Sequence, residues 1–523
     1  MTARFPAFVI IAGLIAGGLL LQSFDEPPAP PARPVVEAGV AIPAARTQPS
    51  LASTWYCAAG STGEGGIGEH VLLLANPTNT ARQATITAIP GSIASAPEPP
   101  TAAGATTTVP SSTTTEAPPV TEPPAPLVTR DVRLAAQSRL VVPMRELVPE
   151  AELLSAMVEI EGGEVAVEHE ITSSRGRATA PCSTTASPSW SIPWGVTERG
   201  AGELLVFLNP FPDDATVDIS FATDEGVRDT LRFQGFVVPG RSVVGAYIDQ
   251  DVTRKTQVSA QITVRGGRLV VDRVQTFNGT DAREAITLSL GAPSAADVWV
   301  FPDGLTGPGL QEQIVVFNPS DEVAEVDVEL RLDDPETNGI PEPFELTVGP
   351  GRYSILNLHE EDRVPPEVAH AIIVHSLNGV GIVAERVIVA GEGASRTGVG
   401  ATLGSPVGAP TWFFPGGGTS AERDEFITIV NLAEESVTYD VIGLASGRTL
   451  AIEGLQGLTL EPLARVSLRI GDHVIRDDLP LVVSADGPVV AERGLYRVGG
   501  GGISQSMGIP LDDEIFIPDP LGG

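Results

Sequence analysis

Residue types that carry out chemistry are scarce in this chain of 523 residues. Its six histidines show no metal-binding spacing such as HExxH, and there is no phosphate-binding loop, GxSxG turn or EF-hand loop. A carboxylate pair for glycoside hydrolysis has no positive support, because 66 acidic residues always offer pairs. We therefore expect no enzyme activity, no metal, no cofactor and no small-molecule substrate.

Basic residues are also few, since 32 bases stand against 66 acids and give a formal net charge of −34. Such a chain repels nucleic acid and anionic lipid, so a nucleic-acid partner is excluded. Lys255 is the only lysine, which reflects G+C-rich coding and not a site.

Aromatic residues make up only 5% of the chain, whereas 56 glycines and 46 prolines supply many turns. Near the C-terminus, strand-like runs such as EFITIVNL, VTYDVIGL and ARVSLRI are separated by turn residues about every ten positions. Seven or eight short strands in about a hundred residues fit a two-sheet sandwich of immunoglobulin-like size. The sequence therefore predicts an all-β fold.

Four internal repeats are visible in the chain. Each opens on a tryptophan, which is followed 21, 19, 19 and 19 residues later by an asparagine that ends an aliphatic run. The residues are Trp55, Trp190, Trp299 and Trp412, and then Asn76, Asn209, Asn318 and Asn431. We expect the tryptophans to fill the core between two sheets, with stacking on sugar rings as the alternative. We expect the asparagines to cap the turn after their strand.

Each repeat closes on a valine-rich run that holds an acid next to a base. These residues are Glu168 and His169, Asp272 and Arg273, Glu385 and Arg386, and Glu492 and Arg493. Neighbours in a strand point to opposite faces, so the acid cannot pair with its adjacent base. We expect each arginine to bind loop carbonyls or a carboxylate of the opposing sheet. The alternative is a repeated contact with a carboxylate ligand or a carbohydrate.

Residues 5–24 form an uncharged run with Arg4 before it and Asp25 and Glu26 after it. As a helix of about 30 Å this run would span a bilayer, with the rest of the chain outside. We therefore expect an uncleaved single-pass anchor in the cell membrane, and a cleaved signal peptide is the alternative.

Two cysteines, Cys57 and Cys182, lie at the two ends of the first repeat. In an exported chain such a pair is best explained by a disulfide; free thiols and metal ligation are the alternatives. The bond would enclose a Thr/Pro-rich tract at 90–126, which we expect to be disordered and which is either an O-glycosylated stalk or an unmodified loop.

The expected organisation is four tandem immunoglobulin-like β-sandwich repeats after an N-terminal transmembrane helix. Its segments are the signal anchor 1–24, a Pro-rich linker 25–54, repeats at 55–187, 188–296, 297–410 and 411–511, and a tail 512–523 with a docked strand. Whether each Trp strand belongs to its own or the preceding module is left open by the sequence.

The motifs WYCAAG, the N-P that ends the aliphatic run, and VVAER together resemble a tandem-repeat family of exported proteins from high-G+C Gram-positive and related bacteria. That family is catalogued as a domain of unknown function. The resemblance covers roughly residues 55–510, and the departures are His169, Trp194 and the missing proline after Asn431. It implies an exported, modular protein and no particular activity.

From these features we expect a membrane-anchored extracellular protein that acts as a structural spacer or interaction scaffold of the cell envelope. Sandwiches stacked end to end would form a rod. The alternative is a module that binds envelope polysaccharide or a surface protein through loops or exposed aromatics. A hydrolase would need a deep cleft with a carboxylate pair.

Overall fold

The computed structural model describes residues 42–46, 51–94, 126–280, 283–445, 447–498, 501–511, 515–516 and 518. Regular structure in these residues is almost all β-strand, so the predicted all-β class is confirmed. The expected anchor at 1–24 lies outside them. In the part of the chain that is described, no helix is long and apolar enough to cross a bilayer.

The described residues contain thirty-three strands, which follow one another in four groups. Repeat 1 contains β1 (Ala52–Cys57), β2 (Glu69–Asn76), β3 (Arg82–Ile93), β4 (Val128–Leu134), β5 (Ser138–Pro143), β6 (Leu153–Glu161), β7 (Ala166–Ser173) and β8 (Gly176–Pro181). Repeat 2 contains β9 (Ser189–Ile192), β10 (Ala201–Asn209), β11 (Ala215–Thr223), β12 (Gly226–Val238), β13 (Ser242–Tyr247), β14 (Ser259–Gly266), β15 (Val270–Asn278) and β16 (Glu284–Leu290).

Repeats 3 and 4 continue the same succession. Repeat 3 contains β17 (Val298–Gly304), β18 (Leu310–Asn318), β19 (Ala324–Leu332), β20 (Phe344–Val348), β21 (Arg352–Asn357), β22 (His370–Ser376), β23 (Val383–Ala390) and β24 (Gly398–Leu403). Repeat 4 contains β25 (Ala409–Phe414), β26 (Arg423–Asn431), β27 (Val437–Leu444), β28 (Thr449–Ala451), β29 (Leu458–Leu460), β30 (Arg465–Arg469), β31 (Leu481–Arg497), β32 (Ile503–Met507) and β33 (Ile509–Pro510). The short helical turns are η2 (Met144–Glu146), α2 (Pro335–Asn338), η4 (Leu358–Glu360) and η5 (Ile470–Asp472).

One strand order recurs in the repeats. In repeat 3, β17-β22-β19-β20 forms one sheet and β21-β18-β23-β24 forms the other. Repeats 1 and 2 pair their strands in the same order, and in repeat 4 the long strand β31 serves both sheets. The Trp strand pairs with the sixth strand of its own repeat, as β1 does with β6 and β17 with β22. The boundary left open by the sequence is therefore set: the Trp strand belongs to the repeat that it opens.

Sequence patterns explain which strands lie deepest. The third strand β11 alternates between buried and partly exposed residues, as expected for a strand with one face toward a core. The seventh strand β15 instead has six consecutive buried residues, and β7 and β23 show the same pattern. Because successive side chains face opposite sides, both faces of each seventh strand are covered.

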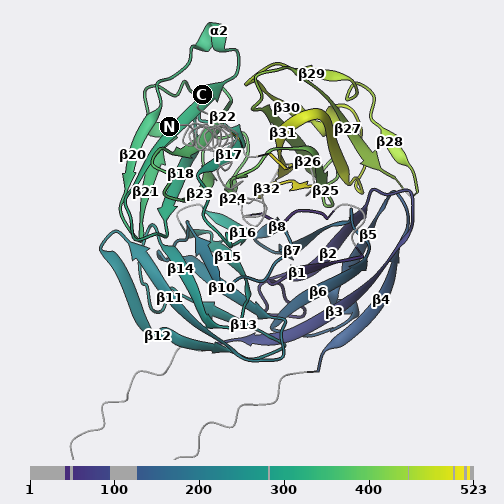
Figure 1. Ribbon diagram of the computed structural model, residues 1–523, viewed down its shortest axis with the longest axis vertical. Coiled ribbons are helices and arrows are strands. Elements are labelled where there is room, and N and C mark those ends of the chain that lie inside the picture. Colours follow the sequence, from purple (N-terminus) through teal and green to yellow (C-terminus); the bar gives the residue numbers. More distant parts are fainter. Residues whose placement is uncertain are drawn as a thin grey trace, which may run out of the picture. The chain divides into compact units, whose positions relative to one another are not determined.

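The four repeats close into a ring. Their eighth strands, β8, β16, β24 and β32, lie at the centre and contact one another in circular order, β32 touching β8 as β16 touches β24 (Figure 1). Residues 39–523 accordingly cluster as one unit. The expected end-to-end rod is wrong, because the eighth strand of repeat 4 packs against that of repeat 1.

The hydrophobic cores are not separate, in contrast to the expectation of self-contained modules. One core joins Trp190 and its surroundings in repeat 2 to Ile89 and Leu153 of repeat 1. A second core combines Trp55 of repeat 1 with Phe413 of repeat 4. Burial of apolar surface therefore holds neighbouring repeats together as well as each repeat within itself.

Two predicted boundaries need correction. The Thr/Pro tract was expected to begin at residue 90, but β3 continues to Ile93 and pairs in parallel with β13 of repeat 2. This pairing merges sheets of repeats 1 and 2 into a single eight-stranded sheet. The rest of the tract lies largely outside the described residues. The linker was expected to reach residue 54, yet Ala45 is buried and donates its backbone N–H to Pro510 at 2.8 Å.

The disulfide between Cys57 and Cys182 is confirmed, with a Cα–Cα distance of 4.6 Å and a sequence separation of 125 residues. Both cysteines are buried. In the C-terminal tail, Phe516 forms a β-bridge with Gly408, the residue before β25.

Candidate functional site

The repeated acids and bases meet where one repeat joins the next, and we call each of these contacts a joint. Arg273 of repeat 2 donates to the carbonyl of Trp194, in a loop of its own repeat, as expected. The carboxylate that it binds, however, is Glu385 of repeat 3 and not one of the opposing sheet of its own repeat. Its two terminal nitrogens donate to the two carboxylate oxygens at 2.9 and 2.7 Å. Both side chains are almost completely buried, so the pair is a bidentate contact in a low-dielectric environment.

The next two joints also pair a buried arginine with a buried glutamate, through a single hydrogen bond at Arg386 and through two at Arg493. Arg386 of repeat 3 donates to Glu492 of repeat 4 at 2.5 Å. Arg493 of repeat 4 donates to both oxygens of Glu168 in repeat 1 at 3.1 Å. The base of each repeat thus reaches the acid of the following one, and repeat 4 returns to repeat 1. Because acid and base occupy opposite faces of one strand, each dipeptide contacts both neighbours.

The joint between repeats 1 and 2 is the exception. His169 stands where the other repeats have arginine, and its Nε2 lies 3.5 Å from Oδ2 of Asp272 without hydrogen-bond geometry. Burial, with a further contribution from His70, lowers the pKa of His169 well below its usual value. Burial raises the pKa of Asp272 to about 7. This joint therefore holds a neutral imidazole, and the β3–β13 pairing supplies its cohesion instead.

Each acid also caps a backbone N–H just after the Trp strand of the preceding repeat. Glu168 accepts from the N–H of Gly416 at 2.7 Å, four residues after Trp412. The other acceptors are Glu385 for Trp194, Glu492 for Asp303, and Asp272 for Ala58 and Ala59. The three glutamates thus bind both a side chain and the main chain of the neighbouring repeat, whereas Asp272 binds the main chain alone.

A second set of buried polar residues was missed by the sequence analysis. These residues lie on the second strand, six positions before the recurring asparagine: His70, Glu203, Glu312 and Glu425. A glycine occurs five positions after each tryptophan, at Gly60, Gly195, Gly304 and Gly417, and three of the four, all but Gly304, lie beside the buried residue of their own repeat. A Cβ on Gly195 would lie 2.1 Å from Oε2 of Glu203. Both offsets are constant in the sequence and could have revealed the set.

The carboxyl groups of this second set are poorly compensated in two repeats. Neither oxygen of Glu203 has a hydrogen-bond partner among the described residues. Burial raises the pKa of Glu203 to about 8, although Arg273 opposes the rise. Burial likewise raises the pKa of Glu425 to about 7. In repeat 1, burial lowers the pKa of His70 to about 4, so both histidines of that repeat are neutral.

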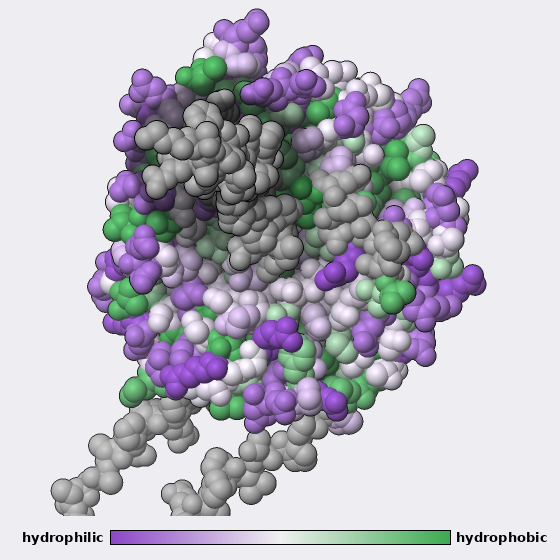
Figure 2. All heavy atoms as spheres, in the orientation of Figure 1, coloured by the Kyte–Doolittle hydropathy of each residue, from purple (hydrophilic) through white to green (hydrophobic). Residues whose placement is uncertain are grey.

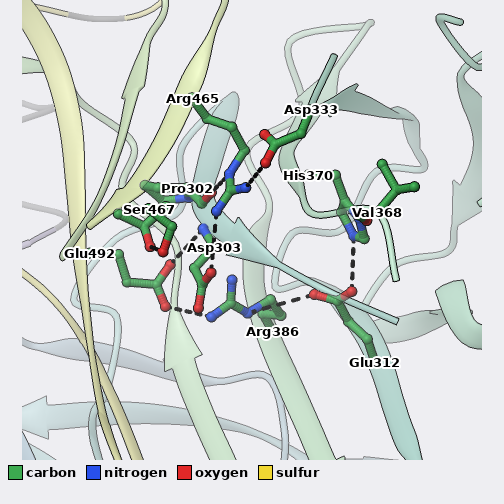
Figure 3. A network of polar contacts seen from close by, with 11 residues as sticks. Pro302, Asp303, Glu312, Asp333, Val368, His370, Arg386, Arg465, Ser467 and Glu492 are labelled. Carbon is green, nitrogen blue, oxygen red and sulfur yellow. Dashed lines mark hydrogen bonds and ion pairs between the residues drawn. The ribbon is translucent and has the colours of Figure 1, made fainter. Parts of the chain in front are cut away.

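The joint between repeats 3 and 4 carries the most extended polar network (Figure 3). Arg386 lies between Glu492 and Glu312, and Glu312 in turn contacts Nε2 of His370 at 2.9 Å. Burial alone would lower the pKa of Arg386, but the surrounding acids, Glu492 foremost, raise it overall. The guanidinium therefore stays charged.

A second arginine strengthens two of the joints from the fifth strand. Arg465 of repeat 4 binds the Pro302 carbonyl at 2.9 Å and the Asp333 carboxylate at 2.9 Å, both in repeat 3 (Figure 3). Arg139 occupies the same strand position in repeat 1 and contacts the carbonyls of Pro415 and Gly417 in repeat 4.

The recurring tryptophans and asparagines lie inside the repeats. All four tryptophans have no exposed surface, so stacking of these side chains on sugars is wrong. Three of them donate Nε1 to a carbonyl before or within the seventh-strand run: Leu269, Ile382 and Val489. Each asparagine Nδ2 donates to the carbonyl four residues on, and Oδ1 accepts the N–H two residues on, as a cap of the turn requires.

The centre of the ring holds little space. A cavity of about 40 Å³ lies between the four eighth strands, with Ile42 and Pro43 at its edge. That volume accommodates only a few water molecules. Among the described residues, no group of three or more His, Cys, Asp or Glu is placed to hold a metal ion. The buried charges are directed at each other and at the backbone, which is an arrangement for assembly.

Comparison with known proteins adds a partial family match. Residues 164–282 match the model of a family of unknown function, DUF5719. The matched segment contains the acid and base dipeptides of both repeats 1 and 2. No curated protein matches the chain.

Two solved structures show weak similarity. A Thermotoga maritima protein, described as 1070, is 22% identical over 21% of this chain and 94% of its own, with a TM-score of 0.19. Trypsin-activated alpha-2-macroglobulin from Escherichia coli is 10% identical over 89% of this chain and 42% of its own, with a TM-score of 0.11. At these scores neither supports a conclusion about fold or function.

Proposed function

We propose that this protein is a non-enzymatic scaffold on the outer side of the cell membrane, in which immunoglobulin-like modules form a rigid ring held by one N-terminal anchor. The observation that supports it most is the buried contact between the base of one repeat and the acid of the next at three of the four joints, including the joint that connects repeat 4 to repeat 1. The acids and bases of the seventh strands make their contacts with neighbouring repeats. Such buried contacts would make the ring rigid and leave its peripheral loops available for binding.

The outer surface fits this role. Figure 2 shows hydrophilic side chains around the periphery of one face, with hydrophobic residues scattered among them. A net charge of −34 keeps such a surface soluble and separated from anionic polymers except where bases gather. The disulfide fits an oxidising compartment outside the cytoplasm, because such bonds are rare inside it.

The experiment that tests this proposal combines location and shape. The full chain is expressed in a Gram-positive bacterial host, and intact cells are treated with protease. We expect cleavage of the repeats without lysis, and single-particle images of the purified chain should show closed rings. Protection in intact cells, or open and extended particles, would overturn the proposal.

A further inference from the structure

Two clefts lie where neighbouring repeats meet, and they differ in charge. The cleft between repeats 4 and 1 has a volume of about 670 Å³ and is lined by Arg177, Arg423 and Arg497. A second cleft, at which Arg283 of repeat 2 meets repeat 3, is instead lined by four acids, Glu360, Glu361, Asp362 and Glu392. The register partners of repeat 3 that correspond to Arg423 and Arg497 are Leu310 and Ala390, so the arginine pair is particular to repeat 4.

Two of the arginines face each other directly. Arg423 on β26 is the register partner of Arg497 on β31, so two like charges lie side by side on adjacent strands. Like charges in this position destabilise a sheet. Within the described residues neither arginine has an ion pair, and Arg423 only donates to the Asp477 carbonyl at 3.4 Å. The chain has about twice as many acids as bases, yet no acid forms an ion pair with either of these two arginines within the described residues.

The third arginine comes from the neighbouring repeat. Arg177 on β8 lies 3.3 Å from Glu170 and faces the same cleft. Burial and the charge of Arg177 together lower the pKa of Arg423, which the nearby acids offset only in part. Glu422 and Asp477 also line the cleft, and both are exposed. Glu170 thus compensates Arg177, whereas Arg423 and Arg497 have no ion pair in the part of the chain that is described.

We propose that this cleft binds an oxyanion, a carboxylate or phosphate group on a small molecule or saccharide unit, between Arg423, Arg497 and Arg177. Guanidinium groups match both anions with paired N–H donors. The bound anion would neutralise the opposed pair on β26 and β31 and would bridge repeats 4 and 1. This inference does not depend on the scaffold proposal, because it requires only the cleft.

The test is isothermal titration calorimetry on the full chain with two probes, inorganic phosphate and glucuronate. We expect one of them to bind and the other to bind more weakly, which identifies the source of the anion. Arg423→Gln should weaken binding at least about tenfold, the loss of one charge-assisted contact. Raising the salt concentration should also weaken it.

The matched control is Arg228→Gln, which removes one equally charged but half-exposed arginine on β12 in repeat 2. It should leave affinity unchanged. If Arg423→Gln does not fold, the exposed Arg497→Gln gives the same readout. No heat with either probe up to roughly 10 mM, a range that includes millimolar affinities, would overturn the proposal, as would equal weakening by the control.

Discussion

Arg493 in the last repeat binds Glu168 in the first, although 325 residues separate them in the sequence. The contact lies at the joint that turns a row of four repeats into a ring. It has the same two-bond geometry as the joint between repeats 2 and 3, which are consecutive along the chain. Closure therefore uses the interaction that already holds neighbours together, and it needs no specialised segment.

Arg493→Ala should destabilise the protein by about 3 to 5 kcal/mol, because the Glu168 carboxylate would remain buried without its partner. Chemical denaturation gives the free energy of unfolding. Arg448→Ala, at an exposed position of the same repeat, should stay within about 0.5 kcal/mol of the parent.

Removing both charges with Glu168→Gln and Arg493→Met should recover part of the loss, since no lone charge is then buried. Unfolding curves that coincide for Arg493→Ala and the parent would show that the ring does not depend on this joint.

The pH dependence of stability should change in Glu203→Gln. The pKa of Glu203 rises from its ordinary 4.5 to about 8 on burial, so the folded state prefers the protonated form. Its contribution is fully present below about pH 4.5 and is lost as the pH rises through about 8, with a limit on the order of 4 kcal/mol.

Denaturation of both proteins at about pH 5 and about pH 9 measures this effect. The parent should lose more stability over the interval than Glu203→Gln, which carries no titrating group there. Parallel losses in the two proteins would place the pH dependence elsewhere.

Reduction of the disulfide should lower the melting temperature of the whole ring and not of the first repeat alone. The bond closes a loop of 125 residues, which corresponds to about 4 to 5 kcal/mol in the chain-entropy model. Because the core around Cys57 extends into repeat 4, we expect one shifted calorimetric transition. A separate low-temperature transition for repeat 1 would show that the cores melt independently.

Gly195→Ala should be strongly destabilising, since the added methyl group would lie 2.1 Å from the Glu203 carboxylate. Gly266→Ala is the control in the same repeat, because nothing lies within 4 Å of its added Cβ. We expect a melting temperature close to the parent for the control and a clear decrease for Gly195→Ala. Equal effects would mean that the space beside Glu203 is not critical.

Residue spacing predicted much of the internal structure of a repeat. The alternation of strands and turns indicated an all-β chain, and the two cysteines indicated a disulfide that the structure contains. Such features depend on short-range rules, because strand periodicity fixes the face to which a residue such as Arg273 points.

What packs against that face could not be predicted in the same way. The partner of Arg273 is Glu385 in the next repeat, and nothing in a single repeat shows which surface a neighbour presents. The ring likewise depends on the rotation between successive repeats, which the pattern of one repeat does not encode. Glu203 differs, since its constant offset from Asn209 was readable and was overlooked.

The bridge between Ala45 and Leu511 brings two distant points of the chain into adjacent backbone positions. A short peptide could join them, and new termini could then be opened in the turn between repeats 2 and 3. Such a circularly permuted chain would keep every joint while its ends moved to the opposite side of the ring. The position of the termini, and so the site at which the ring is attached to a partner or a surface, can thus be changed without altering the contacts between repeats.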